Sequence, residues 1–105
     1  MIDLSGRIAI VTGAAGGLAS EICRLLAEAG ATVIGTDRQG STTRLLDVTD
    51  EAGWHALAAD VDREHGALDI LVHNAGVAVT ERLQDTSFEQ LRLTLAANVE
   101  GPFLG

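Results

Sequence analysis

Arg7-Ile-Ala-Ile-Val-Thr-Gly-Ala-Ala-Gly-Gly-Leu-Ala19 contains the pattern from which the architecture of this chain can be inferred. Its first part, residues 8–11, is apolar, too short for a helix and rich in β-branched side chains, so it predicts a buried strand. After the glycines, the apolar residues recur at the spacing of one helical face: Leu18, Ile22, Leu25, Leu26 and Ala29. The stretch therefore predicts a strand, a tight turn and a helix in immediate succession.

The turn contains Gly13, Gly16 and Gly17, and the predicted helix begins at Leu18. This arrangement brings free backbone N–H groups and the positive end of a helix dipole to one point, which suits a phosphate group. The same pattern also occurs in an ordinary strand-to-helix turn. A P-loop is excluded because it needs a Lys at the start of the helix, and the sequence contains only Arg among its seven basic residues.

Composition limits the other function classes. The 105 residues are 47% hydrophobic and 21% charged, which predicts one globular domain. The net charge of −8 argues against nucleic acid and anionic membranes as partners. No apolar run approaches the ~20 residues of a membrane span, and His55 and His65 lack metal-ligand spacing. The single Cys23 allows no internal disulfide, and we expect a cytoplasmic protein.

The remaining chain repeats the strand-and-helix unit. Residues 31–36 predict a second strand, and Arg44–Val48 predicts a third. Only about six residues separate these two strands, so the second crossover helix is lost or reduced to a turn. A helix ending at Gly66 and a fourth strand over residues 68–73 follow, and then a helix with a capping box from Thr86 to Glu89. The pattern predicts an α/β fold with a mainly parallel sheet.

Asp37 follows the second predicted strand, 24 residues after Gly13. An acidic residue at about this distance can accept hydrogen bonds from a ribose 2′-hydroxyl, although a solvated Asp in a loop is the alternative. A 2′-phosphate at about 4 Å from this carboxylate would meet a repulsion of about 4 kcal/mol, which favours NAD over NADP. Arg38 is the competing signal, because a guanidinium can bind a 2′-phosphate.

Three more polar residues lie at the predicted strand ends or in the last helix. Asp47 either contacts an adenine edge or caps the following loop, and both interpretations stay open. Asn74 directly follows the fourth strand, where its amide can bridge neighbouring strand ends. Asn98 lies inside a predicted helix, where Asn is unfavourable, so it marks either a kink or a functional amide.

Several of these segments resemble motifs of the short-chain dehydrogenase/reductase family. Residues 12–19 are similar to its TGxxxGxG turn, residues 47–48 to its adenine-contacting pair, residues 74–76 to its NAG motif, and residues 98–101 to the segment with its catalytic Asn. Ala19 replaces the third glycine of the turn, and His73 replaces the first Asn of the common NNAG form.

The resemblance implies an NAD(P)-dependent oxidoreductase that acts on small alcohols and carbonyls and forms a homo-oligomer. Asp37 favours NAD over NADP as its cofactor. Residues 1–105 would be the N-terminal part of a single Rossmann-fold domain, a doubly wound parallel sheet with strand order 3-2-1-4. Asn98 is the implied catalytic residue. The implied cofactor-binding residues are Gly13, Gly16, Gly17, Leu18, Asp37, Arg38, Asp47, Val48, Asn74, Ala75 and Gly76.

The family's remaining catalytic residues, a Ser and a Tyr-x-x-x-Lys, would lie beyond Gly105, and the sequence contains no Tyr and no Lys. Carbonyl reduction needs a proton donor within hydrogen-bond reach. The sequence therefore predicts the inactive cofactor-binding half of a truncated dehydrogenase. The alternative is a non-catalytic nucleotide-binding or interaction module. Such a module would be expected to protect its edge strand with charges or Pro, and residues 68–72 carry only Asp69.

Overall fold

The computed structural model describes residues 2–40 and 42–105 and contains one four-stranded parallel sheet in the order β3-β2-β1-β4, which confirms the expected topology. The strands are β1 (Ile8–Thr12), β2 (Thr32–Asp37), β3 (Arg44–Leu45) and β4 (Ile70–Val72). The helical elements are α1 (Gly17–Glu28), α2 (Glu51–His65), the 3-10 turn η1 (Leu83–Asp85), α3 (Phe88–Leu95), the π turn η2 (Ala96–Glu100) and α4 (Gly101–Leu104).

The sheet is doubly wound. β1 pairs with β2 from Ile8↔Thr32 to Thr12↔Thr36, and it pairs with β4 on its other side. The chain therefore moves outward from β1 to β2 and β3, and then returns to the opposite side of β1. In open parallel sheets, ligands bind outside the carboxyl ends of the strands at the point where this reversal occurs. Here that point lies between β1 and β4.

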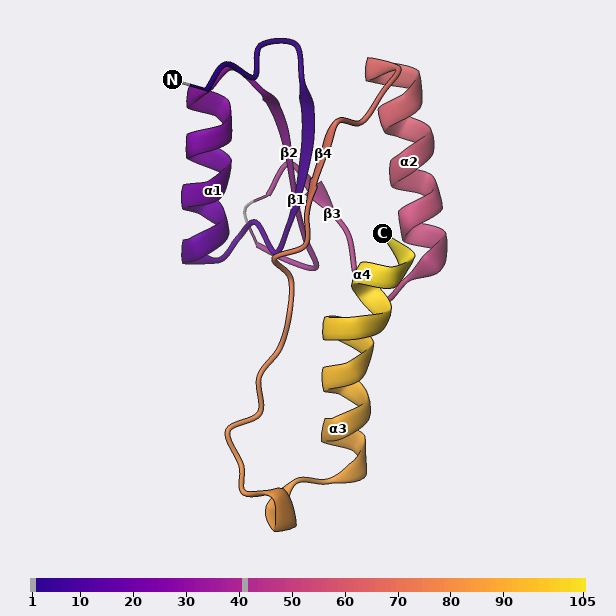
Figure 1. Cartoon of the computed structure of the whole chain (residues 1–105). Helices are drawn as coiled ribbons and strands as arrows, with labels where there is room; N and C mark the ends of the chain where they lie inside the picture. The colour runs from indigo at the N-terminus through magenta and orange to yellow at the C-terminus, as the bar shows by residue number, and fades with distance from the viewer. Residues whose placement is uncertain (1, 41) are drawn as a thin grey trace.

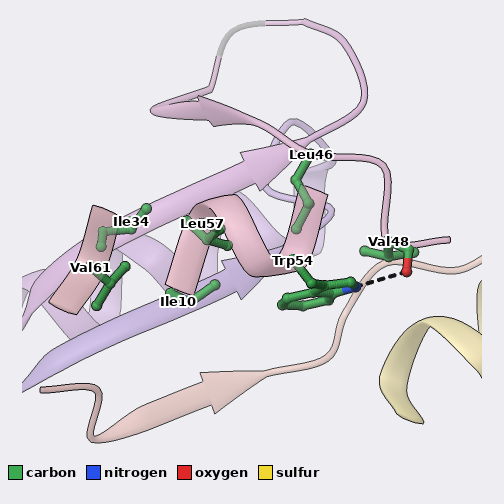
Figure 2. Close-up of a cluster of buried hydrophobic side chains, with 7 residues drawn as sticks. All are labelled: Ile10, Ile34, Leu46, Val48, Trp54, Leu57 and Val61. Carbon is green, nitrogen blue, oxygen red and sulfur yellow. Dashed lines mark hydrogen bonds between the residues drawn. The ribbon is translucent and has the colours of Figure 1, made fainter. Parts of the chain in front are cut away.

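Helices cover both faces of the sheet. Figure 1 shows α1 on one face and α2 on the other, while the segment after β4 leaves the sheet, passes through η1 and returns as α3. The main core lies between α2 and the sheet, where buried side chains from both layers meet (Figure 2). Its buried members are Ile10, Ile34, Leu46, Val48, Trp54, Leu57 and Val61. No helix among residues 2–40 and 42–105 is both long enough and apolar enough to span a bilayer.

The buried side of α1 differs from the prediction. Leu18 and Leu25 are 71% and 53% exposed, whereas Ala19 is fully buried and Ile22 is half-buried. The apolar residues of α1 form two overlapping stripes, and their spacing alone does not show which stripe faces the sheet. The stripe with Ala19 faces the sheet because its small side chain allows the helix to approach the strands closely.

Two predicted strands are shorter than expected. β3 ends at Leu45 instead of Val48, because the Asp47 side chain folds the chain into a turn immediately afterwards. β4 covers residues 70–72 instead of 68–73. As expected from the short β2–β3 connection, the described residues between these strands, 38–40 and 42–43, form no helix.

The predicted capping box is displaced by one residue. Ser87, not Thr86, is the N-cap of α3, and its hydroxyl accepts a hydrogen bond from the Gln90 N–H at 3.0 Å. The Gln90 side chain in turn accepts from the Ser87 N–H at 2.8 Å. The hydroxyl of Thr86 instead donates to the Arg82 carbonyl. Ser and Gln satisfy the capping-box pattern as well as Thr and Glu do, so the sequence contains two registers of the same signal.

Candidate functional site

A cleft of about 430 Å³ lies at the carboxyl ends of β1, β2 and β4. The structure brings nine of the predicted site residues to its walls: Gly13, Gly16, Asp37, Arg38, Asp47, Val48, Asn74, Ala75 and Gly76. Leu46, Thr49, Val77, Leu93 and Ala97 complete the lining. Gly17, Leu18 and Asn98 are outside this lining, the first two in the opening turn of α1 and the third in η2. Residues from five separate segments of the chain therefore form one concave surface.

The turn between β1 and α1 forms one end of the cleft. Gly13 has a φ of +69°, and a Cβ added there would lie 2.9 Å from the Asn74 side-chain nitrogen and 3.0 Å from Ala75 Cα. Gly16 is the N-cap of α1, and among the described residues no side chain forms a capping hydrogen bond at this position. The first N–H groups of a helix have no partner inside the helix. The start of α1 therefore offers backbone donors next to a narrow glycine turn.

Asp37 lies against this turn. Its carboxylate accepts hydrogen bonds from the Ala15 N–H at 3.0 Å and from the Arg38 N–H at 2.7 Å. A carboxylate has about four acceptor positions, so two backbone donors leave it able to accept further hydrogen bonds. Arg38 is exposed and also lines the cleft. Asp37, which favours NAD, and Arg38, which favours NADP, therefore lie next to each other on the same wall of the cleft.

Asp47 organises the segment between β3 and α2. One of its carboxylate oxygens accepts from the Thr49 hydroxyl at 2.7 Å and from the Thr49 N–H at 2.9 Å. These hydrogen bonds lower the pKa of Asp47 from its usual value, and the nearby positive charge of Arg38 contributes a smaller effect. Of the two interpretations of Asp47, the structure shows the turn-forming one, and the adenine contact stays a prediction.

Thr12 joins β1 to the segment after β4, and sequence reasoning missed it. Its side chain is 1% exposed, and its hydroxyl oxygen accepts from the N–H groups of Asn74 at 3.1 Å and Ala75 at 3.0 Å. The Asn74 side chain donates to the Gly13 carbonyl at 3.4 Å, which confirms that this amide bridges strand ends. A polar residue that ends an apolar strand needs a buried partner. That requirement was the available signal for Thr12.

Asn98 holds the chain that follows Gly76. Its side-chain oxygen accepts from the Val77 N–H at 2.8 Å, and its side-chain nitrogen donates to the Val77 carbonyl at 2.8 Å. A Cβ added at Gly76 would lie 2.8 Å from the same oxygen. Asn98 lies in the π turn η2, a feature that often occurs at functional sites. Asn98 therefore lies at an irregular turn of the helix, and a functional role for its amide stays a prediction. The contact between Asn98 and Val77 could not be predicted from the sequence, because only the main-chain atoms of Val77 take part.

Comparisons with known proteins give a consistent result. The family model described as short chain dehydrogenase matches residues 7–105. The chain is 34% identical to an NADP-dependent (R)-specific alcohol dehydrogenase from Lentilactobacillus kefiri, over 97% of this chain and 46% of that protein. It is 30% identical to an NAD-dependent glycerol dehydrogenase from Listeria innocua, over 97% of this chain and 45% of that protein. The chain spans about half the length of the curated relatives it matches.

The fold agrees with solved structures. A crystal structure of a short-chain dehydrogenase/reductase from Burkholderia xenovorans superposes with a TM-score of 0.89 at 34% identity. The match covers 96% of this chain and 48% of that one. The superposition therefore includes nearly the whole of the backbone described above.

Proposed function

The chain belongs to the short-chain dehydrogenase family, and we propose on that basis that it provides the cofactor-binding half of an NAD-dependent oxidoreductase. The observation that carries the proposal is the cleft, in which the glycine turn, Asp37, Asp47 and Asn74 meet at the carboxyl ends of parallel strands. Members of this family use NAD(H) or NADP(H), and the relatives above include one of each kind.

The residues present fit a dinucleotide. The backbone donors at the start of α1 would hold the diphosphate next to Gly13, where a Cβ would collide with Asn74. Asp37 would accept hydrogen bonds from the adenosine ribose. Asp47 and Val48 would contact the adenine, and Asn74, Ala75 and Gly76 would approach the rest of the cofactor. With a net charge of −8, the chain must bind the diphosphate through these local dipoles.

The preference for NAD is part of the proposal. The Asp37 carboxylate is fixed by two backbone N–H groups, so it cannot turn away easily from a ligand at the turn. A 2′-phosphate beside this fixed negative charge would be repelled. Arg38 lies on the same wall and supports the NADP alternative. The relatives use both cofactors, so the cofactor preference has to be measured.

We place the chain in a cytoplasmic homo-oligomer that interconverts small alcohols and carbonyl compounds, with residues 1–105 as the N-terminal part of one Rossmann-fold domain. The nicotinamide supplies or accepts the hydride in this chemistry. The 105 residues contain no Tyr and no Lys, and Asn98 cannot itself donate a proton at neutral pH. We therefore expect these residues to bind the cofactor without turnover. The same observation favours the second candidate, a non-catalytic nucleotide-binding or interaction module.

The test compares two glycines with similar positive φ angles. Gly13 and Gly66 have φ values of +69° and +77°, but a Cβ at Gly66 meets no atom within 4 Å. Gly13→Ala should weaken NAD binding at least tenfold by calorimetry, while Gly66→Ala should stay within about twofold of wild type. Circular dichroism checks that both variants are folded. Failure of the wild-type chain to bind either NAD or NADP would contradict the proposal.

Turnover distinguishes the two candidates. The 105-residue chain should not reduce NAD with any alcohol, whereas a longer chain that supplies the proton donor should do so. Clear turnover by the 105 residues would contradict the assignment as a half-site. If a longer chain binds NAD but transfers no hydride, the non-catalytic module is the better description.

A further inference from the structure

Trp54 lies directly behind the wall of the cleft. It is in the first turns of α2, is 8% exposed and belongs to the main core. Its indole N–H donates to the Val48 carbonyl at 2.8 Å, and Figure 2 shows the indole edge directed at that oxygen. Val48 is also one of the residues that line the cleft. One core side chain therefore holds the backbone of a cleft residue.

The segment that includes Val48 has little support from the sheet. β3 contains only two residues, and its pairing with β2 is followed by one more backbone bond, from the Leu46 N–H to the Asp37 carbonyl at 2.8 Å. Asp47 and Thr49 then fold into their own local turn. Because this turn closes on itself, it does not anchor the segment to the rest of the protein. The Trp54 hydrogen bond supplies a directional anchor at this point.

Two further contacts surround Trp54 and Val48. A Cβ added at Gly101 would lie 2.8 Å from Val48 Cγ2, so α4 packs directly against the Val48 side chain. The Trp54 ring also meets His73 edge-on, with a centroid distance of 6.2 Å and an interplanar angle of 64°. His73 immediately precedes Asn74, which lies on the other wall of the cleft. Trp54 thus contacts both the β3–α2 segment and the end of β4.

We propose that Trp54 is a positioning residue for the wall that contacts the adenine base. This inference rests on the proposed dinucleotide function, because it concerns the side chain that holds Val48 and Asp47 in position to contact the adenine. A hydrogen bond to a backbone carbonyl fixes both distance and direction. Loss of this bond lets the wall shift, and a shift of the wall weakens recognition of the base edge more than binding of the diphosphate.

The experiment compares NAD with nicotinamide hypoxanthine dinucleotide, which differs at the base, on the 105-residue chain. Trp54→Phe keeps an aromatic ring in the core but removes the N–H. Val61→Ala is the matched control, because Val61 is a 5% exposed core residue of the same helix and is not part of the cleft lining. Trp54→Phe should weaken NAD binding about fivefold, the effect of one net hydrogen bond, and should lower the preference for NAD over the analogue. Val61→Ala should lower the melting temperature and leave that preference unchanged.

Equal preference in wild type and Trp54→Phe would overturn the inference while leaving the proposed function in place. Failure of wild type to bind either dinucleotide would overturn both. A second measurement does not depend on the folding of a variant, because Trp54 is the sole tryptophan of the sequence. Its emission in wild type should change on titration with NAD, with the same dissociation constant as calorimetry gives. Emission that stays constant at saturating NAD would also overturn the inference.

Discussion

The carboxylate of Asp37 accepts a hydrogen bond from the backbone N–H of Ala15, with 3.0 Å between the two atoms. Asp37 ends β2, and Ala15 lies in the turn between β1 and α1. The contact places the acidic side chain and the glycine turn on the same side of the sheet. If the two groups lay on opposite sides of the sheet, one ligand could not contact both of them.

Asp37→Ala should change the choice of cofactor. The substitution removes both the acceptor for a ribose and the charge that repels a 2′-phosphate, so the ratio of NAD to NADP affinity should fall at least tenfold. Calorimetric titration of both dinucleotides gives the ratio. Asp62→Ala is the control, since it removes the same charge from an exposed position on α2. An unchanged ratio in Asp37→Ala would remove this role from Asp37.

Thr12→Val should destabilise the fold by about 2–4 kcal/mol, because the N–H groups of Asn74 and Ala75 both lose their buried acceptor. Thr12→Ser keeps the hydroxyl and should cost about 1 kcal/mol through the lost methyl group. Urea unfolding measures both changes in the free energy of unfolding, with the dependence of that free energy on urea concentration held the same for all variants. Equal losses in the two variants would show that packing, and not the hydrogen bonds, explains the effect.

Asn98→Ala should release the backbone of Val77. The Val77 N–H donates to the Asn98 side-chain oxygen at 2.8 Å and is protected by this bond, so its hydrogen exchange should become at least tenfold faster in the variant. Asn98→Asp keeps an acceptor for this N–H and should retain most of the protection. Exchange measured by NMR at single-residue resolution separates the two. Equal protection in Asn98→Ala and wild type would mean that Asn98 does not fix this segment.

The ion pairs of Asp60 lead us to expect that the stability of the fold depends on pH. Hydrogen bonds from Arg44 and then Arg63 lower the pKa of Asp60 below the ordinary value of 3.8. The Arg44 contact connects β3 to α2, and the Arg63 contact lies within α2. A carboxyl whose pKa is lowered by folding stabilises the protein above its unfolded pKa and loses this effect as the pH falls through the folded pKa. Wild type should therefore be more stable than Asp60→Asn at pH 7, and this difference should shrink below about pH 4.

Urea unfolding of both proteins between pH 7 and pH 2.5 measures the difference. Asp62→Asn, on an exposed part of the same helix, controls for the general effect of removing one negative charge. A stability difference between wild type and Asp60→Asn that stays constant over this range would contradict the assignment to the Asp60 ion pairs.

Much of the architecture could be predicted because the alternation of apolar runs and glycine turns is a local signal. The strand after Arg7, the turn at Gly13 and the end of α2 at Gly66 all follow from a few adjacent residues. The strand order is not local and came from the family resemblance. Most of the cleft followed from one rule, namely that the carboxyl ends of parallel strands share an edge.

The missed features depend on contacts between distant residues. Thr12 and Asn74 are 62 positions apart, and Asn98 and Val77 are 21 apart, so no short pattern contains either pair. The predicted buried side of α1 was wrong at Leu18 and Leu25, because two apolar stripes overlap and only the close approach of Ala19 to the sheet selects one of them. The predicted capping register, with Thr86 as the N-cap, was wrong because two capping signals begin at neighbouring residues.

The π turn at Ala96–Glu100 accommodates one more residue than an α-helical turn. Each residue of an α-helix rotates the chain by about 100°, so this insertion changes the phase of every later side chain around the helix axis. Gly101 faces Val48 at close range because of that change. Deleting a single residue from the turn would present a different neighbour to Val48, and any side chain with a Cβ at that contact would push the helix away from the cleft. The extra residue therefore allows one helical segment to make two different contacts: Asn98 binds the backbone of Val77, and Gly101 packs against Val48.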